Sequence, residues 1–350
     1  MKINKFGILT IALSALFLSC NDSDKDEIIP SDSDYSDGIL VSGEGSTTTG
    51  SITFIPSDLS APQQQIYKTE NDTELGTFVQ SIEFSETKAY ISVDNQQTIT
   101  VVDRYSFKEI AKINTQLEHP RYMEVVGDIG YSTNWGSTSD ETDDFIAVID
   151  LNANTVTKTI PVPLGPERIV EKNGSLYVSH KGAWGTNNVI SVIDIATEVV
   201  TEIEVGYKPD ELLFDSSDML WVLSSGNESW TGSESKGSIT QINTNTNTIL
   251  KTIDFEDTEH PELMEILQDK IYYFLGDAIY EMEVTATDLP STKFIETGYI
   301  YGMSLNNSQL FTVIASYTAL SDLHVYSLSS KSMTKTLKVG LGASKIYFND

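Results

Sequence analysis

The sequence predicts an all-β fold, a seven-bladed β-propeller, from three observations. A strand ending in Val-Ile-Asp, or in a degenerate form of that pattern, occurs seven times, with its last residue at positions 56, 103, 150, 194, 243, 281 and 327. The repeats are therefore 38 to 49 residues long, and each holds four short β-like runs separated by turn residues. Four strands in a repeat of this length are typical of one propeller blade, and no stretch has sustained helical spacing.

The four runs of a repeat differ in residue type. The first begins at or near a proline, as at Pro120 and Pro166, and the second contains an aromatic residue. The third is the Val-Ile-Asp run, and the fourth alternates, as in 155–160 and 248–253. Alternation with a period of two is the pattern of a strand that buries one face. We therefore expect four-stranded blades.

The two ends of the chain are predicted to close one shared blade. The run 342–348 matches the first strand of a blade and has no strands after it, whereas the runs 38–42, 51–55 and 65–67 match strands two to four. Joined together, they leave no free sheet edge, so the array closes into a ring and needs no capping repeats. We predict one propeller domain at 38–350.

Residues 1–19 have the composition of a lipoprotein signal peptide. Lys2 and Lys5 precede a short apolar run that ends at Ser19-Cys20 and is too short to span a bilayer. Cys20 is the single cysteine of the chain, so no intramolecular disulfide can form. A cysteine placed after a small residue resembles a bacterial lipobox, which implies a lipid anchor at Cys20. A signal cleaved elsewhere, with Cys20 incidental, is the alternative.

Residues 20–37 are predicted to be an acidic, flexible tether. This segment is dominated by Asp and Ser, and a polar tract of like charge cannot collapse. An acidic stretch directly after the lipid cysteine also resembles the surface-export signal of Bacteroidetes lipoproteins, which implies an outer-membrane location facing the cell exterior. A plain linker would have a similar composition.

The charge balance excludes two classes of partner. The chain has 22 Lys+Arg against 51 Asp+Glu, a net charge of −29, and contains no basic run. Because nucleic acids and anionic membranes are recognised by clustered cations, we expect neither as a partner, and membrane contact through the lipid anchor only. The acidity serves solubility, or else it favours a cationic ligand or a basic partner surface.

Three consecutive repeats carry long polar insertions after their second strand, where other repeats have short turns. Each insertion contains one tryptophan: Trp135 within 133–142, Trp184 within 180–188 and Trp230 within 226–235. The loops after strands two and four of a blade emerge on the same face, so these insertions should form a wall beside one mouth of the channel. Exposed aromatic residues on adjacent loops favour a flat or apolar ligand. Alternatively, each indole folds back and caps its own blade.

The turns that lead into each first strand are expected to line the same mouth. They present a mixed, hydrogen-bonding rim. Such a rim suits a polar ligand with amides or hydroxyls; alternatively, its charged side chains simply pair with each other. The predicted ligand-binding residues are Gln80, Arg121, Tyr122, Asn134, Trp135, Arg168, His180, Lys181, Trp184, Asn187, Asp210, Asn227, Trp230, Tyr301 and Tyr317, and Glu211, Glu262 and Lys345 share the rim.

The sequence contains no recognised signature of catalysis. There is no metal-ligand spacing among the four histidines, no Gly-x-Ser-x-Gly motif and no phosphate-binding glycine loop, so we predict no metal site, no cofactor and no enzyme activity. His119 and His260 precede prolines at equivalent positions and are interpreted as turn residues. Propeller lactonases and lyases assemble sites from scattered His, Glu and Arg. An enzyme of that type is the lesser alternative, and His180 with Glu228 or Arg168 would be its candidate site.

The proline start, the Tyr-Val second strand and the Val-Ile-Asp third strand over 38–350 resemble the YncE-like, or YVTN-type, propeller family. With Cys20 and the acidic segment, the chain is similar to propeller surface lipoproteins of Bacteroidetes, one branch of which is the BtuG type. That resemblance implies capture of cobalamin, a corrinoid, and its delivery to a TonB-dependent outer-membrane transporter. An adhesion or scaffold propeller, whose tryptophan loops contact protein or glycan, is the alternative. No contact residue is carried over from the family.

Overall fold

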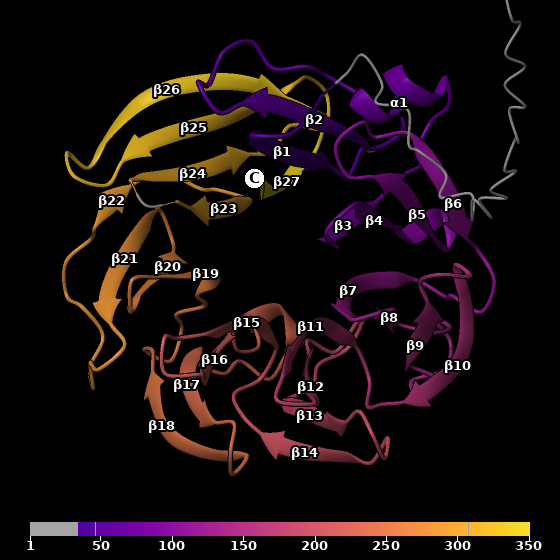
Figure 1. Cartoon of the computed structure of the whole chain (residues 1–350). Helices are drawn as coiled ribbons and strands as arrows, with labels where there is room; N and C mark the ends of the chain where they lie inside the picture. The colour runs from indigo at the N-terminus through magenta and orange to yellow at the C-terminus, as the bar shows by residue number, and fades with distance from the viewer. Residues whose placement is uncertain (1–33, 46, 307) are drawn as a thin grey trace, which may run out of the picture. The chain divides into compact units, whose positions relative to one another are not determined.

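The computed structural model describes residues 34–45, 47–306 and 308–350. These residues form seven antiparallel sheets arranged as blades around a central axis (Figure 1), which confirms the predicted seven-bladed β-propeller. No helix in this described part is long and apolar enough to cross a membrane. The predicted signal peptide (1–19), Cys20 and most of the acidic segment 20–37 lie outside the described residues.

Six blades each contain four strands that are consecutive in the chain and pair in chain order. The first three are β3 (Val79–Phe84), β4 (Lys88–Val93), β5 (Thr98–Asp103) and β6 (Glu109–Ile113); β7 (Pro120–Val126), β8 (Ile129–Asn134), β9 (Phe145–Asp150) and β10 (Thr155–Pro161); and β11 (Pro166–Lys172), β12 (Ser175–His180), β13 (Val189–Asp194) and β14 (Val200–Glu204). The next three are β15 (Pro209–Phe214), β16 (Met219–Ser224), β17 (Ser238–Asn243) and β18 (Thr248–Asp254); β19 (Glu262–Leu267), β20 (Lys270–Leu275), β21 (Ala278–Glu283) and β22 (Ile295–Glu296); and β23 (Gly302–Leu305), β24 (Gln309–Ile314), β25 (Ser321–Ser327) and β26 (Ser332–Val339). Two single 3-10 turns, η1 (Asp94–Gln96) and η2 (Ser229–Thr231), lie in the connections after β4 and β16.

The seventh blade joins the two ends of the chain, as predicted. Strand β1 (Gly38–Gly43) pairs with β2 (Ser51–Pro56) on one side and with β27 (Ala343–Asn349) on the other. The outer position holds one bridge, between Phe54 and Gln63. The run 65–67, expected to be the fourth strand, instead starts the helix α1 (Ile66–Asn71), because Gln65 adopts a left-handed φ of 54° that breaks the extended chain.

Hydrophobic clusters fill the interfaces between neighbouring blades all the way around the ring. Seven clusters are present among the described residues, and each draws its residues from two adjacent sheets. The shared blade packs on both neighbours in this way. Tyr35 also packs edge-on against Phe54 and Phe107 and is buried, so the ordered body of the propeller begins before β1.

The aspartate that ends the Val-Ile-Asp pattern holds the turn between the third and fourth strands. The Asp150 carboxylate accepts hydrogen bonds from the backbone N–H groups of Asn152 and Ala153, both at 2.9 Å. Asp194 likewise accepts from the backbone N–H and the hydroxyl of Thr197. Asp side chains favour such turns because they satisfy backbone donors locally. The motif that revealed the repeat is therefore structural.

Gly302, the first residue of β23, offers a test of inter-blade packing. A Cβ added there would lie 1.8 Å from the backbone oxygen of Ser344, on the neighbouring innermost strand β27. We expect Gly302→Ala to lower the free energy of unfolding by about 2–3 kcal/mol, because a backbone oxygen can move only with its strand. Urea denaturation measures this change. Gly185→Ala, where the nearest contact would be 3.4 Å from the Leu164 side chain, is the control, and equal midpoints for both variants would contradict the packing argument.

Candidate ligand-binding funnel

β-Bulges place the polar side chains of the rim. The innermost strand of each blade is its first strand: β3, β7, β11, β15, β19, β23 or β27. In the described residues, all of these except β23 carry an extra residue near their start. In β7 the register shifts between Pro120 and Met123, so that Arg121 and Tyr122 share one position opposite β8. Because a bulge redirects side chains, both residues line the channel. The pairs Glu167/Arg168 and Asp210/Glu211 lie at the equivalent bulges of β11 and β15.

Two connected cavities lie along the axis. The mouth has a volume of about 230 Å³ and is lined by the starts of the innermost strands together with residues that follow second strands, such as Lys181 and Glu228. Loops from strands two and four therefore share one face, as predicted. The second cavity, here called the chamber, has a volume of about 250 Å³. The mouth and the chamber together are called the funnel. The residues that line both cavities are Tyr122, Arg168, Glu211, Leu263, Ser344 and Lys345.

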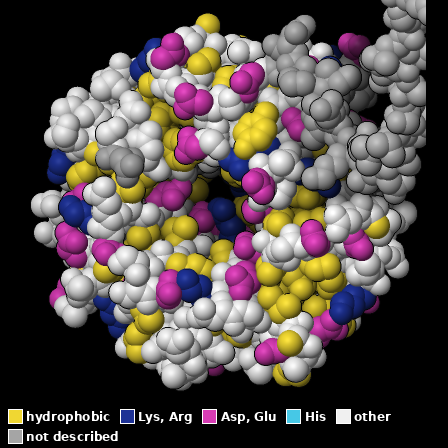
Figure 2. Space-filling view, in the orientation of Figure 1, with side chains coloured by type: hydrophobic (Ala, Val, Ile, Leu, Met, Phe, Trp, Pro, Cys, Tyr) yellow, Lys and Arg dark blue, Asp and Glu magenta, His cyan; other side chains and the backbone are white. Residues whose placement is uncertain are grey.

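Figure 2 shows acidic and basic side chains around and inside the central opening. Most of the rim charges pair with each other. Nε and Nη2 of Arg121 donate to the Glu167 carboxylate at 3.1 and 3.0 Å, and its Nη1 donates to Asp94 at 3.1 Å. Of the two interpretations of the rim, the one in which neighbouring charges pair therefore holds for Arg121.

The next two cations of the rim are paired in the same way. Arg168 donates to Asp210 at 3.4 Å and to Glu211 at 2.5 Å, and Lys181 donates to Asp210 at 2.6 Å. Although burial opposes it, the charges of Lys181 and Arg168 hold the pKa of Asp210 well below its usual range. These pairs form a fixed polar lining that spans adjacent blades.

The three tryptophans lie on adjacent loops, but they differ in exposure. Trp135 is half-buried: its indole N–H donates to the Pro166 oxygen at 3.0 Å, and the Arg121 guanidinium lies 3.8 Å from its ring centroid. Trp184 is 72% exposed and meets Trp135 edge-on at 5.7 Å. Trp230 is 78% exposed. Two indoles are thus available to a ligand, and Trp135 packs against one of them, Trp184.

Trp230 belongs to the same wall. Lys208 Nζ lies 5.1 Å from the Trp230 ring centroid and 2.6 Å from the carboxylate of Glu228, which lines the mouth. The Thr186 hydroxyl donates to the Asn227 side chain at 2.7 Å, which ties the second insertion to the third. The insertions therefore form one continuous wall beside the mouth.

Apart from the half-buried Trp135, the predicted ligand-binding residues fall into two groups in the structure. Those that line the mouth are Gln80, Arg121, Tyr122, Arg168, Lys181, Asp210 and Tyr301, with Tyr317 edge-on to Tyr301 at 6.5 Å and Trp184 and Trp230 on the wall. Asn134, His180, Asn187 and Asn227 instead serve the loops themselves. Asn134, His180 and Asn227 are buried, and Asn187 donates to the Leu164 oxygen at 2.9 Å. For the three buried residues the prediction of ligand contact is corrected, whereas for the half-buried Asn187 it stays a prediction.

His180 shows why a sequence position inside an insertion does not guarantee exposure. It is the last residue of β12, its side chain is fully buried, and its ring nitrogens lie 2.8 Å from Ser191 Oγ and 3.3 Å from the Leu164 oxygen. Burial lowers the pKa of His180 to about 4, so the ring is neutral. The lactonase-like arrangement of His180 with Glu228 or Arg168 is therefore wrong.

Several residues of the funnel were missed from the sequence. At the mouth these are Glu44, Glu167 and His260, and in the chamber they are Glu83, Glu124 and Glu265. The chamber glutamates lie two positions beyond the bulges, so the alternation of side chains along a strand turns them inward too. Extending the alternation from Tyr122 to Glu124 would have found this layer.

The pKa values of the chamber glutamates are raised to neutral pH or above it. Burial, together with the Glu124 carboxylate, raises the pKa of Glu83 to about 8. Burial, with Glu171, raises the pKa of Glu124 to about 7, and burial, with Glu211, raises the pKa of Glu265 to about 8. Among the described residues, no group of three or more His, Cys, Asp or Glu side chains is arranged to hold a metal ion.

Comparisons with known proteins show the fold and no closer kinship. No family model and no curated protein matches the chain. Among solved structures it is similar to a putative 6-phosphogluconolactonase from Bacteroides fragilis (TM-score 0.64, 11% identity, 92% of this chain and 100% of that chain). It is also similar to the dihydro-heme d1 dehydrogenase NirN in complex with DHE (0.57, 14%, 91% and 77%) and to apo AztD from Citrobacter koseri (0.55, 10%, 88% and 96%). Similarity at these identities extends to the propeller alone, and the named enzymes among these structures mean that the fold does not exclude catalysis.

Proposed function

We propose that this chain is a surface lipoprotein that captures a corrinoid, cobalamin, on the mouth face of its propeller. The observation that carries the proposal is the pair of exposed indoles, Trp184 and Trp230, on adjacent loops beside a polar funnel. A flat macrocycle with amide side chains needs apolar faces for its ring and hydrogen-bonding groups for its periphery. The tryptophan wall supplies the apolar faces, and the rim supplies the hydrogen-bonding groups.

The size of the cavities sets how such a ligand would bind. The mouth, at about 230 Å³, is below the size of common small-molecule pockets. A corrinoid would therefore rest across the rim against Trp184 and Trp230, with only its substituents reaching into the funnel. The exposed ring of Tyr317, whose hydroxyl lies 3.4 Å from Glu44 beside the shared blade, offers a further apolar contact.

One structural relative supports this class of ligand. The dihydro-heme d1 dehydrogenase has a propeller similar to this chain and is in complex with DHE. A heme, like a corrin, is a flat tetrapyrrole. We further propose that Cys20 carries the lipid anchor on the outer membrane and that the captured ligand passes to a TonB-dependent transporter.

Equilibrium dialysis against cyanocobalamin, followed by its own visible absorbance, tests the proposal. We expect the purified protein to retain the ligand at micromolar concentration. The double variant Trp184→Ala/Trp230→Ala should lose about 2–4 kcal/mol of binding free energy, a roughly 30- to 1,000-fold rise in Kd, because buried aromatic contacts dominate interfaces. Its thermal midpoint should not change, since both indoles are solvent-exposed.

Leu250→Ala is the matched control, because Leu250 is an exposed apolar residue of the outer strand β18. It should bind like the wild type. If the wild-type protein does not retain cyanocobalamin, a corrinoid is ruled out as the ligand and the protein- or glycan-binding alternative is favoured. Unchanged binding by the double variant would show that Trp184 and Trp230 are not the contact surface.

A further inference from the structure

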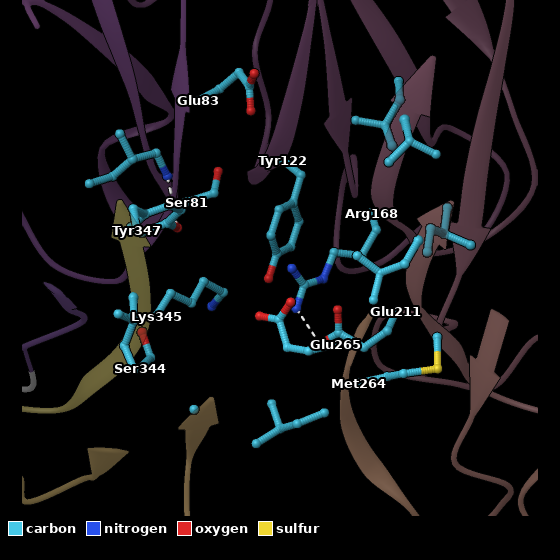
Figure 3. Close-up of a pocket in the computed structure, with 18 of the residues that line it drawn as sticks. Ser81, Glu83, Tyr122, Arg168, Glu211, Met264, Glu265, Ser344, Lys345 and Tyr347 are labelled. Atoms are coloured by element: carbon cyan, nitrogen blue, oxygen red, sulfur yellow. Dashed lines mark hydrogen bonds and ion pairs between the residues drawn. The ribbon is translucent and has the colours of Figure 1, made fainter. Parts of the chain in front are cut away.

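Lys345 differs from the other cations of the funnel. Arg121, Arg168 and Lys181 each have a carboxylate within hydrogen-bond distance. Lys345, on β27, makes no ion pair within the described part of the chain, and its amine lies 5.6 Å from the ring centroid of Tyr122. It lines both the mouth and the chamber, and Figure 3 shows its amine directed toward the axis.

The carboxylates around Lys345 are already engaged. Glu44 lies 3.5 and 3.4 Å from the hydroxyls of Tyr301 and Tyr317, and Glu167 and Glu211 accept from the two arginines. Burial lowers the pKa of Lys345 to about 8, with Arg168 and Arg121 contributing against the opposing charge of Glu44. The protonated amine is thus a surplus positive charge at the centre of the molecule.

Two hydroxyl groups without an acceptor lie at the same place. Ser344 is 3% exposed, lines both cavities, and its Oγ has no hydrogen-bond partner in the described residues. The phenol of Tyr122 points into the chamber (Figure 3) and likewise makes no hydrogen bond within the part of the chain that the structure describes. Burial raises the pKa of Tyr122 well above its usual range, so the phenol keeps its proton. A buried donor without an acceptor, as at Ser344 Oγ, is costly unless a ligand supplies one.

We infer that Lys345, Ser344 and Tyr122 form an anion subsite at the junction of the mouth and the chamber, which takes a carboxylate or phosphate group of the ligand. One ammonium and two hydroxyl donors match the several lone pairs of such a group, and a charge-assisted hydrogen bond to an amine is among the stronger ones. The chamber acids Glu83, Glu124 and Glu265 do not oppose the anion below about pH 7, because they are largely protonated there. This inference goes beyond the proposed function, because it holds for any ligand that carries an anionic arm.

Site-resolved acetylation of the purified protein tests the subsite. The protein is treated at about pH 6.5, where the chamber acids are mostly neutral, with a limiting amount of an acetyl succinimidyl ester, and modified lysines are quantified by mass spectrometry. Inorganic phosphate and acetate serve as separate probes of the two anion sources. A probe present at about ten times its Kd should slow modification of Lys345 roughly tenfold by occupancy. Lys338, which is exposed and paired with Asp322 at 2.7 Å, is the internal control.

Thermal denaturation with the same probes gives a second measurement. The anion that protects Lys345 should raise the unfolding midpoint of the wild type and of Lys345→Arg, and should leave that of Lys345→Met unchanged. Ser344→Ala should weaken the protection of Lys345 several-fold. Equal acetylation with and without both anions, or an equal midpoint shift in Lys345→Met, would overturn the subsite. Trp184→Ala/Trp230→Ala should keep full protection, so loss of the subsite and loss of corrinoid binding are separate results.

Discussion

Replacing Arg121 by methionine is expected to lower the free energy of unfolding by about 3–5 kcal/mol, the cost of leaving buried charges without their partner. The Glu167 side chain is 5% exposed and the Asp94 side chain 12%. In the variant Glu167 loses the two N–H groups that donate to it, whereas Asp94 loses Arg121 and keeps His119, whose Nδ1 lies 3.0 Å away. Trp135 loses the guanidinium that lies 3.8 Å from its ring centroid. Chemical denaturation monitored by circular dichroism measures the change.

Two further variants separate this effect from a general effect of losing a cation. Lys158→Met removes the ion pair of Lys158 with Glu198, whose side chains are 51% and 37% exposed, and should cost less than about 1 kcal/mol. Adding Glu167→Gln to Arg121→Met should restore part of the lost stability, because it removes an uncompensated charge. A double variant less stable than Arg121→Met alone would contradict the assignment.

The chamber glutamates should make the propeller less stable as the pH rises. The pKa of Glu83 and of Glu265 is about 8 in the folded chain, against about 4.3 in an unfolded chain. The folded state therefore binds more protons between these values. Their stabilising contribution is complete below about pH 4 and is lost as the pH rises to about 8. We expect the thermal midpoint to fall across this window.

Glutamine substitutions isolate the contribution of each acid. Glu265→Gln keeps the shape of the side chain and carries no charge, so at about pH 8 it should be more stable than the wild type by an amount on the order of 2–5 kcal/mol. The two proteins should converge at about pH 4. Glu256→Gln, at an exposed position, should follow the wild type throughout. A wild-type thermal midpoint that stays constant from acid to mildly alkaline pH would contradict the raised pKa of these glutamates in the folded chain.

The architecture could be predicted because its signals are local and repeated. The Val-Ile-Asp strand ends in an aspartate that holds the next turn, as Asp150 and Asp194 do, so several blades carry the motif for the same local reason. Prolines mark four of the six bulged first strands in the described residues, β7, β11, β15 and β19, and the lone first strand at the C-terminus predicted the shared blade. Where a purely local pattern misled, as at 65–67, one left-handed residue turned the chain into a helix.

The state of each side chain in the funnel was decided only by the tertiary structure. Arg121 and Glu167 are 46 residues apart in the chain and meet because their blades are neighbours in the ring. Lys345 comes from the last strand, and it stays unpaired because arginines and tyrosines on other blades already hold the carboxylates around it. Strand order and loop position follow from short-range preferences that the sequence carries residue by residue. Burial and charge pairing follow from which distant residues the closed ring brings within a few ångströms.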